Sequence, residues 1–423
     1  MSIAGIKGMN DILPGEVETW QFLEQKAREV FGIYGFSEIR VPVVEKTELF
    51  CRSIGETTDI VEKEMYTFED KSGNSLTLRP EGTAPVMRSF IQNKLYNLDP
   101  VSKLYYFGPM FRYERPQKGR YRQFHQIGVE AVGVEDARID AQVLAMLMHF
   151  FDAVGIDGVE LQINSLGCAQ CRPLYKQALT EYLRNTLQAL CEDCRRRYRT
   201  NPLRTLDCKV PLCKEATVGA PSVLDHLCED CGTQFERVQS YLHGLDLPFT
   251  VNPRMVRGLD YYTKTTFELV TDRLGSQSAV AAGGRYDGLI KDLGGPALPG
   301  IGFAMGLERL VLLKESDRIE PESPELFLAA LGDEAADRAF LLMSKLQRHG
   351  IRVEMSYQGK SLKAQMRRAD KLGSRFALIL GEEELQKEVA PLRDMAGGEQ
   401  REISLAGDPA ELADRLRTCL GEV

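Results

Sequence analysis

Residues 111–120 have the sequence Phe-Arg-Tyr-Glu-Arg-Pro-Gln-Lys-Gly-Arg, and strand-like alternation flanks them on both sides. Leu104–Phe107 precede this stretch and Gln126–Glu130 follow it. A proline and a glycine lie in the polar segment between, so we predict a long antiparallel hairpin. Arg112 and Glu114 stand on either side of one tyrosine, and we expect them to project from the same strand face.

The hairpin carries many cations. Fixed arginines on a rigid strand, beside a basic loop with Lys118, Arg120 and Arg122, suit a polyanion that presents phosphate at a defined position. A solvated charged hairpin is the alternative that this stretch alone leaves open.

The sequence Phe-Arg-x-Glu followed by a basic loop resembles motif 2 of the class II aminoacyl-tRNA synthetases. Its continuation at 120–126, Arg-Tyr-Arg-Gln-Phe-His-Gln, is similar to the histidyl-tRNA synthetase version, and the resemblance covers essentially the whole chain. It implies an α+β catalytic domain, built on an antiparallel β-sheet flanked by helices, with a helical insertion. It also implies a C-terminal α/β anticodon-binding domain.

Length and composition agree with a globular protein of two or three domains, since the chain has 423 residues and 27% charged residues. The net charge of −8 argues against non-specific coating of nucleic acid, but a specific RNA partner needs only local basic groups. No apolar run approaches the ~20 residues of a membrane span. The N-terminus lacks a signal-peptide pattern, so we expect a cytoplasmic protein with no membrane partner.

Near the N-terminus, Asp11 and Pro14 form a plausible helix start ahead of apolar residues at helical spacing over 17–30. Residues 38–44 are expected to form a strand interrupted by Pro42. A helix followed by a proline-bearing strand resembles motif 1 of class II synthetases, which builds the dimer interface. The resemblance therefore implies a homodimer.

The segment Arg-Pro-Glu-Gly-Thr at 79–83 follows a short predicted strand. Its glycine permits a tight turn, which leaves Glu81 and Thr83 in a strand-end loop where ligand contacts are common. A carboxylate and a hydroxyl there could hold an ammonium group, and an ordinary turn is the alternative. The resemblance implies that both residues grip the amino group of bound histidine.

Three later segments also resemble histidyl-tRNA synthetases. Arg-Gly-Leu-Asp-Tyr-Tyr at 257–262 bears most directly on the substrate, and Gly-Gly-Arg-Tyr-Asp follows at 283–287. Residues 300–310 are predicted to be a glycine-bearing strand that runs into an apolar helix, similar to motif 3. Without the resemblance, Arg309 would be an ordinary surface arginine of that helix.

The resemblance assigns roles to these residues. Arg112 and Arg257 are the expected catalytic residues, at the α-phosphate of ATP. The expected histidine-binding residues are Glu81, Thr83, Gln126, Glu130, Tyr261 and Tyr262. The expected ATP-binding residues are Arg112, Glu114, Arg120, Phe124 and Arg309, with Mg²⁺ on the phosphates. The implied substrates are L-histidine, ATP and tRNA(His).

Eight of the ten cysteines fall between Cys168 and Cys231. Clustered pairs in a reducing compartment point to a metal or to plain thiols before disulfides. The best zinc constellation is Cys191, Cys194, Cys208 and Cys213. Cys228 and Cys231 could serve instead, and Cys168 and Cys171 form a further pair. The resemblance does not imply zinc, and reduced structural cysteines are the alternative.

Composition also indicates the domain limits. We expect a catalytic domain over 1–320, a helical, cysteine-rich insertion over about 168–245, and an anticodon-binding α/β domain over 325–423. Basic residues crowd one predicted helix of the last domain, at Lys360, Lys363, Arg367, Arg368, Lys371 and Arg375.

Two other functions compete with the synthetase. One is a synthetase-like regulatory subunit of the phosphoribosyltransferase that begins histidine biosynthesis. Such subunits lose motif residues and the anticodon-binding domain, whereas Arg112, Arg257, Arg309 and the segment after residue 325 are present here. The other is a simple RNA-binding module, which would not explain why the motif-like segments occur together.

Overall fold

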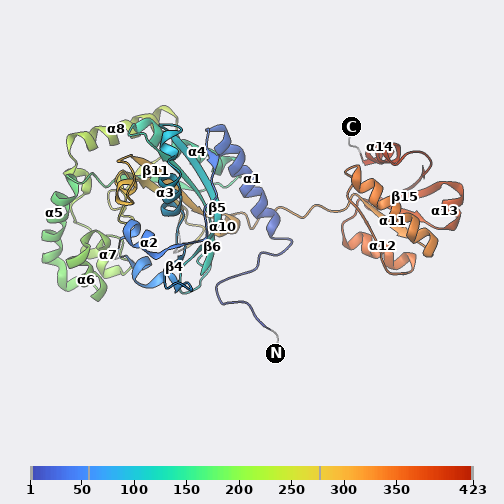
Figure 1. Cartoon of the computed structure of the whole chain (residues 1–423), viewed down its shortest axis with the longest axis horizontal. Coiled ribbons are helices and arrows are strands. Elements are labelled where there is room, and N and C mark those ends of the chain that lie inside the picture. Colours follow the sequence, from blue (N-terminus) through green and yellow to red (C-terminus); the bar gives the residue numbers. More distant parts are fainter. Residues whose placement is uncertain (1–2, 56–57, 276–277, 421–423) are drawn as a thin grey trace. The chain divides into compact units, whose positions relative to one another are not determined.

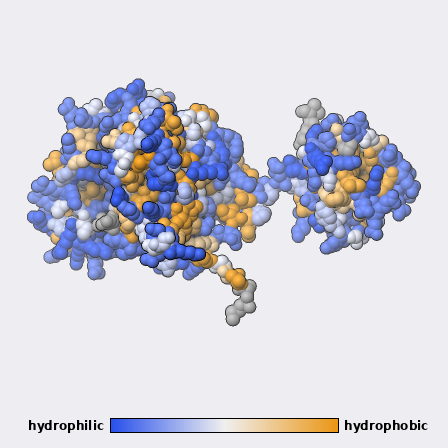
Figure 2. Space-filling model, in the orientation of Figure 1, coloured by the Kyte–Doolittle hydropathy of each residue, from blue (hydrophilic) through white to orange (hydrophobic). Residues whose placement is uncertain are grey.

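The computed structural model describes residues 3–55, 58–275 and 278–420, which belong to two compact units (Figure 1). The first unit is Met1–Ile319 and the second is Glu320–Val423. Within the described ranges, no helix is long and apolar enough to cross a bilayer. Hydrophilic residues cover most of the visible face of each unit, with apolar residues between them (Figure 2).

An eight-stranded, mostly antiparallel sheet forms the centre of the first unit, as predicted. Its spatial order is β1 (Ser37–Glu38), β5 (Ser102–Phe111), β6 (Gln123–Val132), β11 (Gly300–Gly306), β10 (Ala279–Arg285), β9 (Thr263–Val270), β7 (Glu160–Ser165) and β8 (Thr250–Val251). Only the two edge pairs, β1 with β5 and β7 with β8, are parallel.

The predicted hairpin is confirmed as β5 and β6, which pair antiparallel from Ser102 opposite Val132 to Phe111 opposite Gln123. The expectation that Arg112 and Glu114 share a strand face is wrong, because β5 ends at Phe111. The amide of Tyr113 donates to the carbonyl oxygen of Glu64 at 2.6 Å, so the backbone leaves the ladder at that point.

Alternation along β6 sorts its side chains between the two faces of the sheet. Ile127, Val129 and Ala131 are buried in the main core. That core is completed by α1 (Val17–Ile33), α4 (Ala137–Ala153), α8 (Glu229–Gly244) and α10 (Leu307–Leu313). The residues that alternate with these, from Phe124 and Gln126 to Val132, face the opposite side, where the cavity described below lies.

Smaller elements cover that opposite side. They are α2 (Thr47–Ile54), α3 (Thr83–Gln92), α9 (Leu289–Asp292) and a three-stranded sheet of β2 (Val44–Lys46), β4 (Ser75–Leu78) and β3 (Tyr66–Glu69). Helix α3 packs Val86, Met87 and Phe90 against Tyr106 and Met110 of β5. This packing fixes the start of α3 at the edge of the cavity.

Two expectations near the N-terminus are wrong. Residues 38–44 do not form one strand, because β1 and β2 belong to different sheets and Pro42 lies between them. The side chain of Arg79 donates to the carbonyl oxygen of Val41 at 3.0 Å, in place of a strand partner. Helix α1 begins at Val17, with Glu16 as its N-cap, rather than at Asp11 or Pro14.

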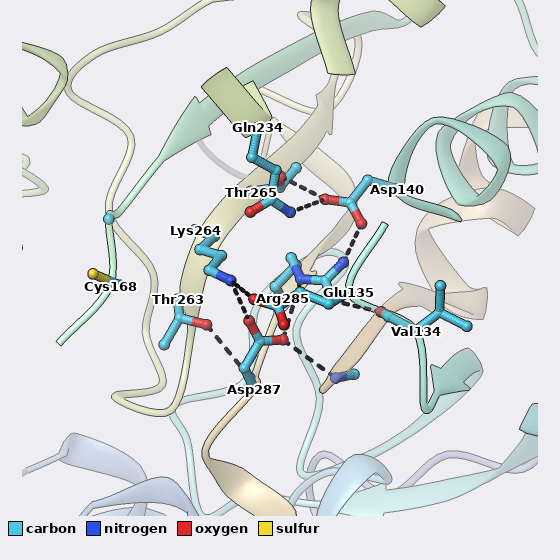
Figure 3. Close-up of polar contacts among 12 residues, drawn as sticks. Val134, Glu135, Asp140, Cys168, Gln234, Thr263, Lys264, Thr265, Arg285 and Asp287 are labelled. Carbon is cyan, nitrogen blue, oxygen red and sulfur yellow. Dashed lines mark hydrogen bonds and ion pairs between the residues drawn. The ribbon is translucent and has the colours of Figure 1, made fainter. Parts of the chain in front are cut away.

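A buried ion network ties α4 to the central strands (Figure 3). Arg285 pairs with Asp140, and its Nη2 donates to the carbonyl oxygen of Val134 at 2.7 Å. The Thr265 hydroxyl donates to Asp140 at 2.7 Å, and Arg285 Nε donates to Asp287 at 3.1 Å. Since each charge has partners, the burial of Arg285 and Asp140 is tolerated, and Arg285 acts as a structural anchor.

The segment after β7 is helical, as predicted. It contains α5 (Cys171–Thr186), α6 (Glu192–Thr200) and α7 (Pro211–Ala216), and α8 returns from it to the sheet (Figure 1). Tyr175, Leu179, Leu183 and Val223 are buried together with three cysteines in a core of their own. The insertion is therefore a small packed unit rather than an open loop.

The second unit is a five-stranded α/β sheet in the order β13 (Val353–Met355), β12 (Leu326–Ala330), β14 (Phe376–Leu380), β15 (Val389–Asp394) and β16 (Gln400–Ser404). Helices α11 (Asp333–Arg348) and α14 (Pro409–Leu420) contribute to one core. Helix α12 (Leu362–Lys371) packs Leu362, Met366 and Ala369 against Phe327 and Ala377. The alternation of residues 351–353 indicates a strand there, but β13 begins two residues later, at Val353.

Candidate active site

A cavity of about 250 Å³ opens on the face of the sheet opposite the main core. Small residues of neighbouring strands, including Ala282, Ala304 and Gly306, line its floor. Of the predicted site residues, the following line it: Glu81, Thr83, Arg112, Glu114, Arg120, Phe124, Gln126, Arg257, Tyr261, Tyr262 and Arg309. Glu130 is the exception, because its side chain is fully buried.

Tyr106 forms part of the wall, and the sequence did not single it out. Its ring lies so close to Gly82 and Gly128 that a Cβ at either glycine would be less than 3.0 Å from it. The two glycines thus leave room for an aromatic ring on β5. Gly128 lies directly opposite Tyr106 in the pairing of β5 with β6. The sequence could have revealed this contact only if the register of the two strands had been known.

Glu81 and Thr83 lie where α3 begins. The Glu81 carboxylate accepts hydrogen bonds from the amides of Thr83 at 2.7 Å and Ala84 at 2.9 Å, so it caps the helix. Burial raises the pKa of Glu81, and these amides oppose that rise. A carboxylate oxygen has two lone pairs, so Glu81 can still accept a hydrogen bond from a ligand in the cavity.

Glu130 forms a buried pair with Tyr286. The Tyr286 hydroxyl donates to Glu130 Oε2 at 2.5 Å. Burial raises the pKa of Glu130 to about 8, against the lowering effect of the Tyr286 hydrogen bond. At neutral pH the folded protein therefore holds this carboxyl mainly in its protonated form, which can donate as well as accept.

Aromatic and amide groups complete this end of the cavity. The rings of Tyr261 and Tyr262 have centroids 4.7 Å apart, and Tyr262 is only 6% exposed. Within the described ranges, the side-chain oxygen of Gln126 is buried and has no hydrogen-bond partner. An unpaired acceptor in a polar cavity favours a ligand with N–H groups.

Arg257 enters the cavity from the segment before β9. It forms an ion pair with Glu268, a residue that the sequence did not single out, and its guanidinium carbon lies 5.2 Å from the Tyr262 ring centroid. Burial disfavours the charge of Arg257, yet Glu268 raises the pKa of the guanidinium above its usual value. The arginine therefore stays charged although only 13% of its side chain is exposed.

Three further arginines line the other end of the cavity. Arg112 Nε donates to the carbonyl oxygen of Pro80 at 2.9 Å, and its guanidinium carbon lies 5.2 Å from the Phe124 ring centroid. Arg120 pairs with Glu114 at 2.7 Å. Arg309 Nε donates to the carbonyl oxygen of Gly119 at 3.2 Å.

The positive charges of these arginines repel one another. Burial lowers the pKa of Arg309, and the charges of Arg120 and Arg112 lower it further. Four arginines around one cavity favour a bound polyanion, which would relieve their mutual repulsion.

A contact between α10 and β6 positions Arg309. The Glu308 carboxylate accepts from the amide of His125 at 2.8 and 3.0 Å, and His125 packs edge-on against Trp20. The sequence did not single out His125 or Glu308. Their contact joins residues 183 positions apart, so only the fold reveals it.

Eight cysteines separate into two groups of four, and in each group the sulfur atoms all lie within 4.8 Å of one another. The inner cluster contains Cys191, Cys194, Cys208 and Cys213, as predicted. The root cluster contains Cys168, Cys171, Cys228 and Cys231, so Cys228 and Cys231 do not combine with Cys191 and Cys194. Four thiols at this spacing are a donor set that suits Zn²⁺.

Comparisons with known proteins agree along almost the whole chain. The family model described as histidyl-tRNA synthetase matches residues 8–310, and the anticodon binding domain model matches residues 325–415. The histidine–tRNA ligase of Syntrophotalea carbinolica is 70% identical over 417 residues, which are 99% of this chain and 100% of that protein. The histidine–tRNA ligase of Geobacter metallireducens is 63% identical over 415 residues. These residues are 98% of this chain and 100% of that protein.

Among solved structures, the crystal structure of apo S. aureus histidyl-tRNA synthetase is similar, with a TM-score of 0.82 and 38% identity. The match covers 98% of this chain and 100% of that one. The resemblance seen in the motifs therefore extends to the fold.

Proposed function

The chain belongs to the histidyl-tRNA synthetase family, and from this we propose how its residues carry out the ligation of histidine to tRNA. ATP is the second substrate of the reaction. The histidine carboxylate attacks the α-phosphate of ATP and pyrophosphate leaves. The 3′-terminal hydroxyl of tRNA(His) then attacks the resulting adenylate, and AMP leaves. The observation that carries the proposed roles is the single cavity that eleven of the expected residues line.

In our proposal, Glu81, Thr83 and Gln126 hold the α-ammonium group of histidine. The unpaired side-chain oxygen of Gln126 and the partly used carboxylate of Glu81 support this role. Glu130 and Tyr262 hydrogen-bond the two imidazole nitrogens, with Tyr261 beside them. A pocket that bonds both nitrogens rejects amino acids that lack them, because its buried polar groups would then be unpaired.

Arg112 and Arg257 are the proposed catalytic residues. Two anions, the histidine carboxylate and the α-phosphate, must meet in the first step, so fixed cations lower the barrier. The Pro80 carbonyl and Glu268 hold these guanidinium groups in place before substrate binds. For the second step we assign no side chain as general base. We propose instead that the phosphate of the adenylate takes the proton of the tRNA hydroxyl.

The proposed ATP site uses the opposite end of the cavity. Phe124 and Arg309 take the two faces of adenine, where stacking and cation–π contacts fit. Glu114 holds the adenine edge or the surrounding backbone, and Arg120 meets the distal phosphates. The Glu114 carboxylate would offer an oxygen ligand to Mg²⁺, which would supply positive charge to the phosphates when bound.

The partner tRNA would use both units. Lys118 and Gln117 of the 112–122 loop are proposed to touch the acceptor end. In the second unit, the basic residues on and around α12 are all exposed, which supports a contact with the anticodon: Lys360, Lys363, Arg367, Arg368, Lys371 and Arg375.

We assign 1–320 to catalysis, with the insertion at about 168–245, and 325–423 to anticodon binding. We also propose a homodimer, and the cytoplasm, where tRNA is charged, as its location.

The inner cluster of cysteines is proposed to hold a structural Zn²⁺ ion. Cys191 Sγ and Cys208 Sγ are 3.9 Å apart, and the amide of Cys191 donates to Cys213 Sγ at 3.1 Å. A closed set of four thiolates leaves no position for substrate, so this metal would stabilise the fold and take no part in catalysis.

Aminoacylation tests the proposed roles. The full chain is mixed with ATP, Mg²⁺, labelled histidine and a tRNA(His) transcript, and the same assay is run on Arg112→Met and Gln126→Met. We expect charging by the unaltered protein and a loss of at least tenfold in both variants. Unchanged charging by either folded variant would remove that residue from the site.

A further inference from the structure

Four thiols meet where the helical insertion leaves the sheet and where it returns. Cys168 and Cys171 follow strand β7, and Cys228 and Cys231 stand at the start of α8. Cys168 and Cys228 are 60 positions apart in the chain, yet their sulfur atoms are 3.9 Å apart. The root cluster therefore joins the two ends of the insertion.

The spacing of these sulfur atoms is that of a metal tetrahedron. Four Zn–S bonds of about 2.3 Å place neighbouring sulfurs about 3.8 Å apart. Cys168 and Cys171 are separated by 3.7 Å, and every pair in the cluster lies within 4.8 Å. The two sulfurs of a disulfide would instead lie about 2.05 Å apart.

Backbone amides point at the thiols, as they would at thiolates. The amide of Cys228 donates to Cys171 Sγ at 3.1 Å, and that of Gln170 donates to Cys168 Sγ at 3.4 Å. Two 16-residue helices, α5 and α8, begin at the cluster. Their positive N-terminal ends favour the net negative charge of a zinc ion with four thiolates.

The backbone is shaped to bring the thiols together. Gly167 has a φ of +63°, a conformation that L side chains rarely adopt, and a Cβ there would be 2.5 Å from the Cys171 Cβ. Cys171 and Cys231 are buried, whereas Cys168 and Cys228 are partly exposed. The cluster is therefore partly accessible from solvent, through Cys168 and Cys228.

The root cluster lies beside a wall of the active-site cavity. Arg172, next to Cys171, donates to the carbonyl oxygen of Asp260 at 3.3 Å and to that of Tyr262. These carbonyls belong to the segment that carries Arg257 and Tyr262. An ion that fixes the first turn of α5 would also fix Arg172 and this segment.

We propose that Cys168, Cys171, Cys228 and Cys231 bind a second Zn²⁺ ion, which closes the root of the insertion. The chain then holds two structural zinc ions, one within the insertion and one at its base. This inference does not depend on the roles proposed for the active-site residues.

Metal content of the full chain tests it. The protein is purified in the presence of a thiol reductant and without chelator, and zinc is measured by elemental analysis and by native mass spectrometry. We expect two zinc ions per chain. No zinc in the folded, reduced protein would overturn the proposal, and so would a single zinc ion that Cys228→Ser retains.

Variants assign each ion to its cluster. Cys228→Ser should leave one zinc ion, Cys208→Ser should leave the root ion, and the control Cys419→Ser should keep two. Because a serine variant could lose zinc by misfolding, Cys228→His supplies a replacement ligand and should restore the second ion. Retention of two zinc ions by Cys228→Ser, or an intact-mass loss of two hydrogens from a root disulfide in the reduced protein, would overturn the assignment.

Discussion

The hydroxyl of Tyr286 donates to the carboxyl oxygen Oε2 of Glu130 across the width of strand β11. Two glycines of that strand make the contact possible. A Cβ at Gly302 would lie less than 3.0 Å from Glu130 Oε2, and one at Gly300 would lie less than 3.0 Å from the Tyr286 ring. The pair therefore depends on β6, on β11 and on the residue that follows β10, and it includes Glu130, one of the proposed imidazole ligands.

Removal of the hydroxyl in Tyr286→Phe should leave Glu130 with a buried, unpaired oxygen. We expect the free energy of unfolding to fall by about 1–3 kcal/mol. The KM for histidine should rise by at least tenfold, because Glu130 is no longer held in one orientation, while the KM for ATP changes less. Urea unfolding and pyrophosphate exchange measure the two effects. Tyr357→Phe is the control, since Tyr357 is 69% exposed and lies in the second unit; equal behaviour of the two variants would refute the role of the pair.

The raised pKa of Glu130 makes stability depend on pH. The carboxyl titrates near its ordinary value of 4.5 in the unfolded chain and at about 8 in the folded protein. Between these values the folded state binds one more proton, so the free energy of unfolding falls as pH rises, by up to about 5 kcal/mol from this group. Glu130→Gln does not titrate and should show a flatter curve from pH 5 to pH 8. Parallel curves for the two proteins would show that Glu130 is ionised in the folded state.

The absence of a side chain at position 302 is expected to be essential. In Gly302→Ala the new Cβ would meet Glu130 Oε2 and the carbonyl oxygen of Val129, a backbone atom that cannot move freely. Overpacking of this kind costs about 1–3 kcal/mol of stability, and it should also weaken histidine binding. Gly244→Ala is the matched control, because a Cβ there meets nothing within 4 Å. Thermal unfolding of both variants tests the prediction, which fails if Gly302→Ala melts like the control.

Loss of the cation at position 257 should affect chemistry more than binding. We expect Arg257→Met to lower kcat for pyrophosphate exchange by about 10²–10³-fold, the typical effect of removing one preorganised transition-state contact. Arg348→Met, at an exposed position of α11, should have no effect. A variant that raises only the KM for histidine and keeps kcat would show that Arg257 binds substrate without catalysing the reaction.

Local sequence predicted the elements whose pattern is continuous. The apolar runs 326–330 and 376–380 each indicate a short strand, and β12 and β14 have these bounds. Each strand is buried on both faces, as is typical of parallel strands. The segment 38–44 was mispredicted as one strand because the pattern does not reveal where a chain passes from one sheet to another. Tertiary pairing decides this, and Pro42 marks the crossing.

Contacts between distant segments explain what the sequence missed in the site. Four residues act through partners on other segments of the fold, and these contacts depend on strand register: Tyr106, Glu268, Tyr286 and Glu308. The grouping of the cysteines also depends on contacts between distant segments. Their spacing predicted the inner cluster, but four pairs can combine in several ways, and only the return of α8 to the end of β7 separates the two sets.

The most direct test of the account is ATP–pyrophosphate exchange by the purified full chain with Mg²⁺, measured with each of the twenty amino acids in turn. We predict exchange with histidine and none above background with the others, because Glu130 and Tyr262 must both find a ring nitrogen. Exchange with another amino acid, or no exchange by a folded protein that binds histidine, would contradict the account.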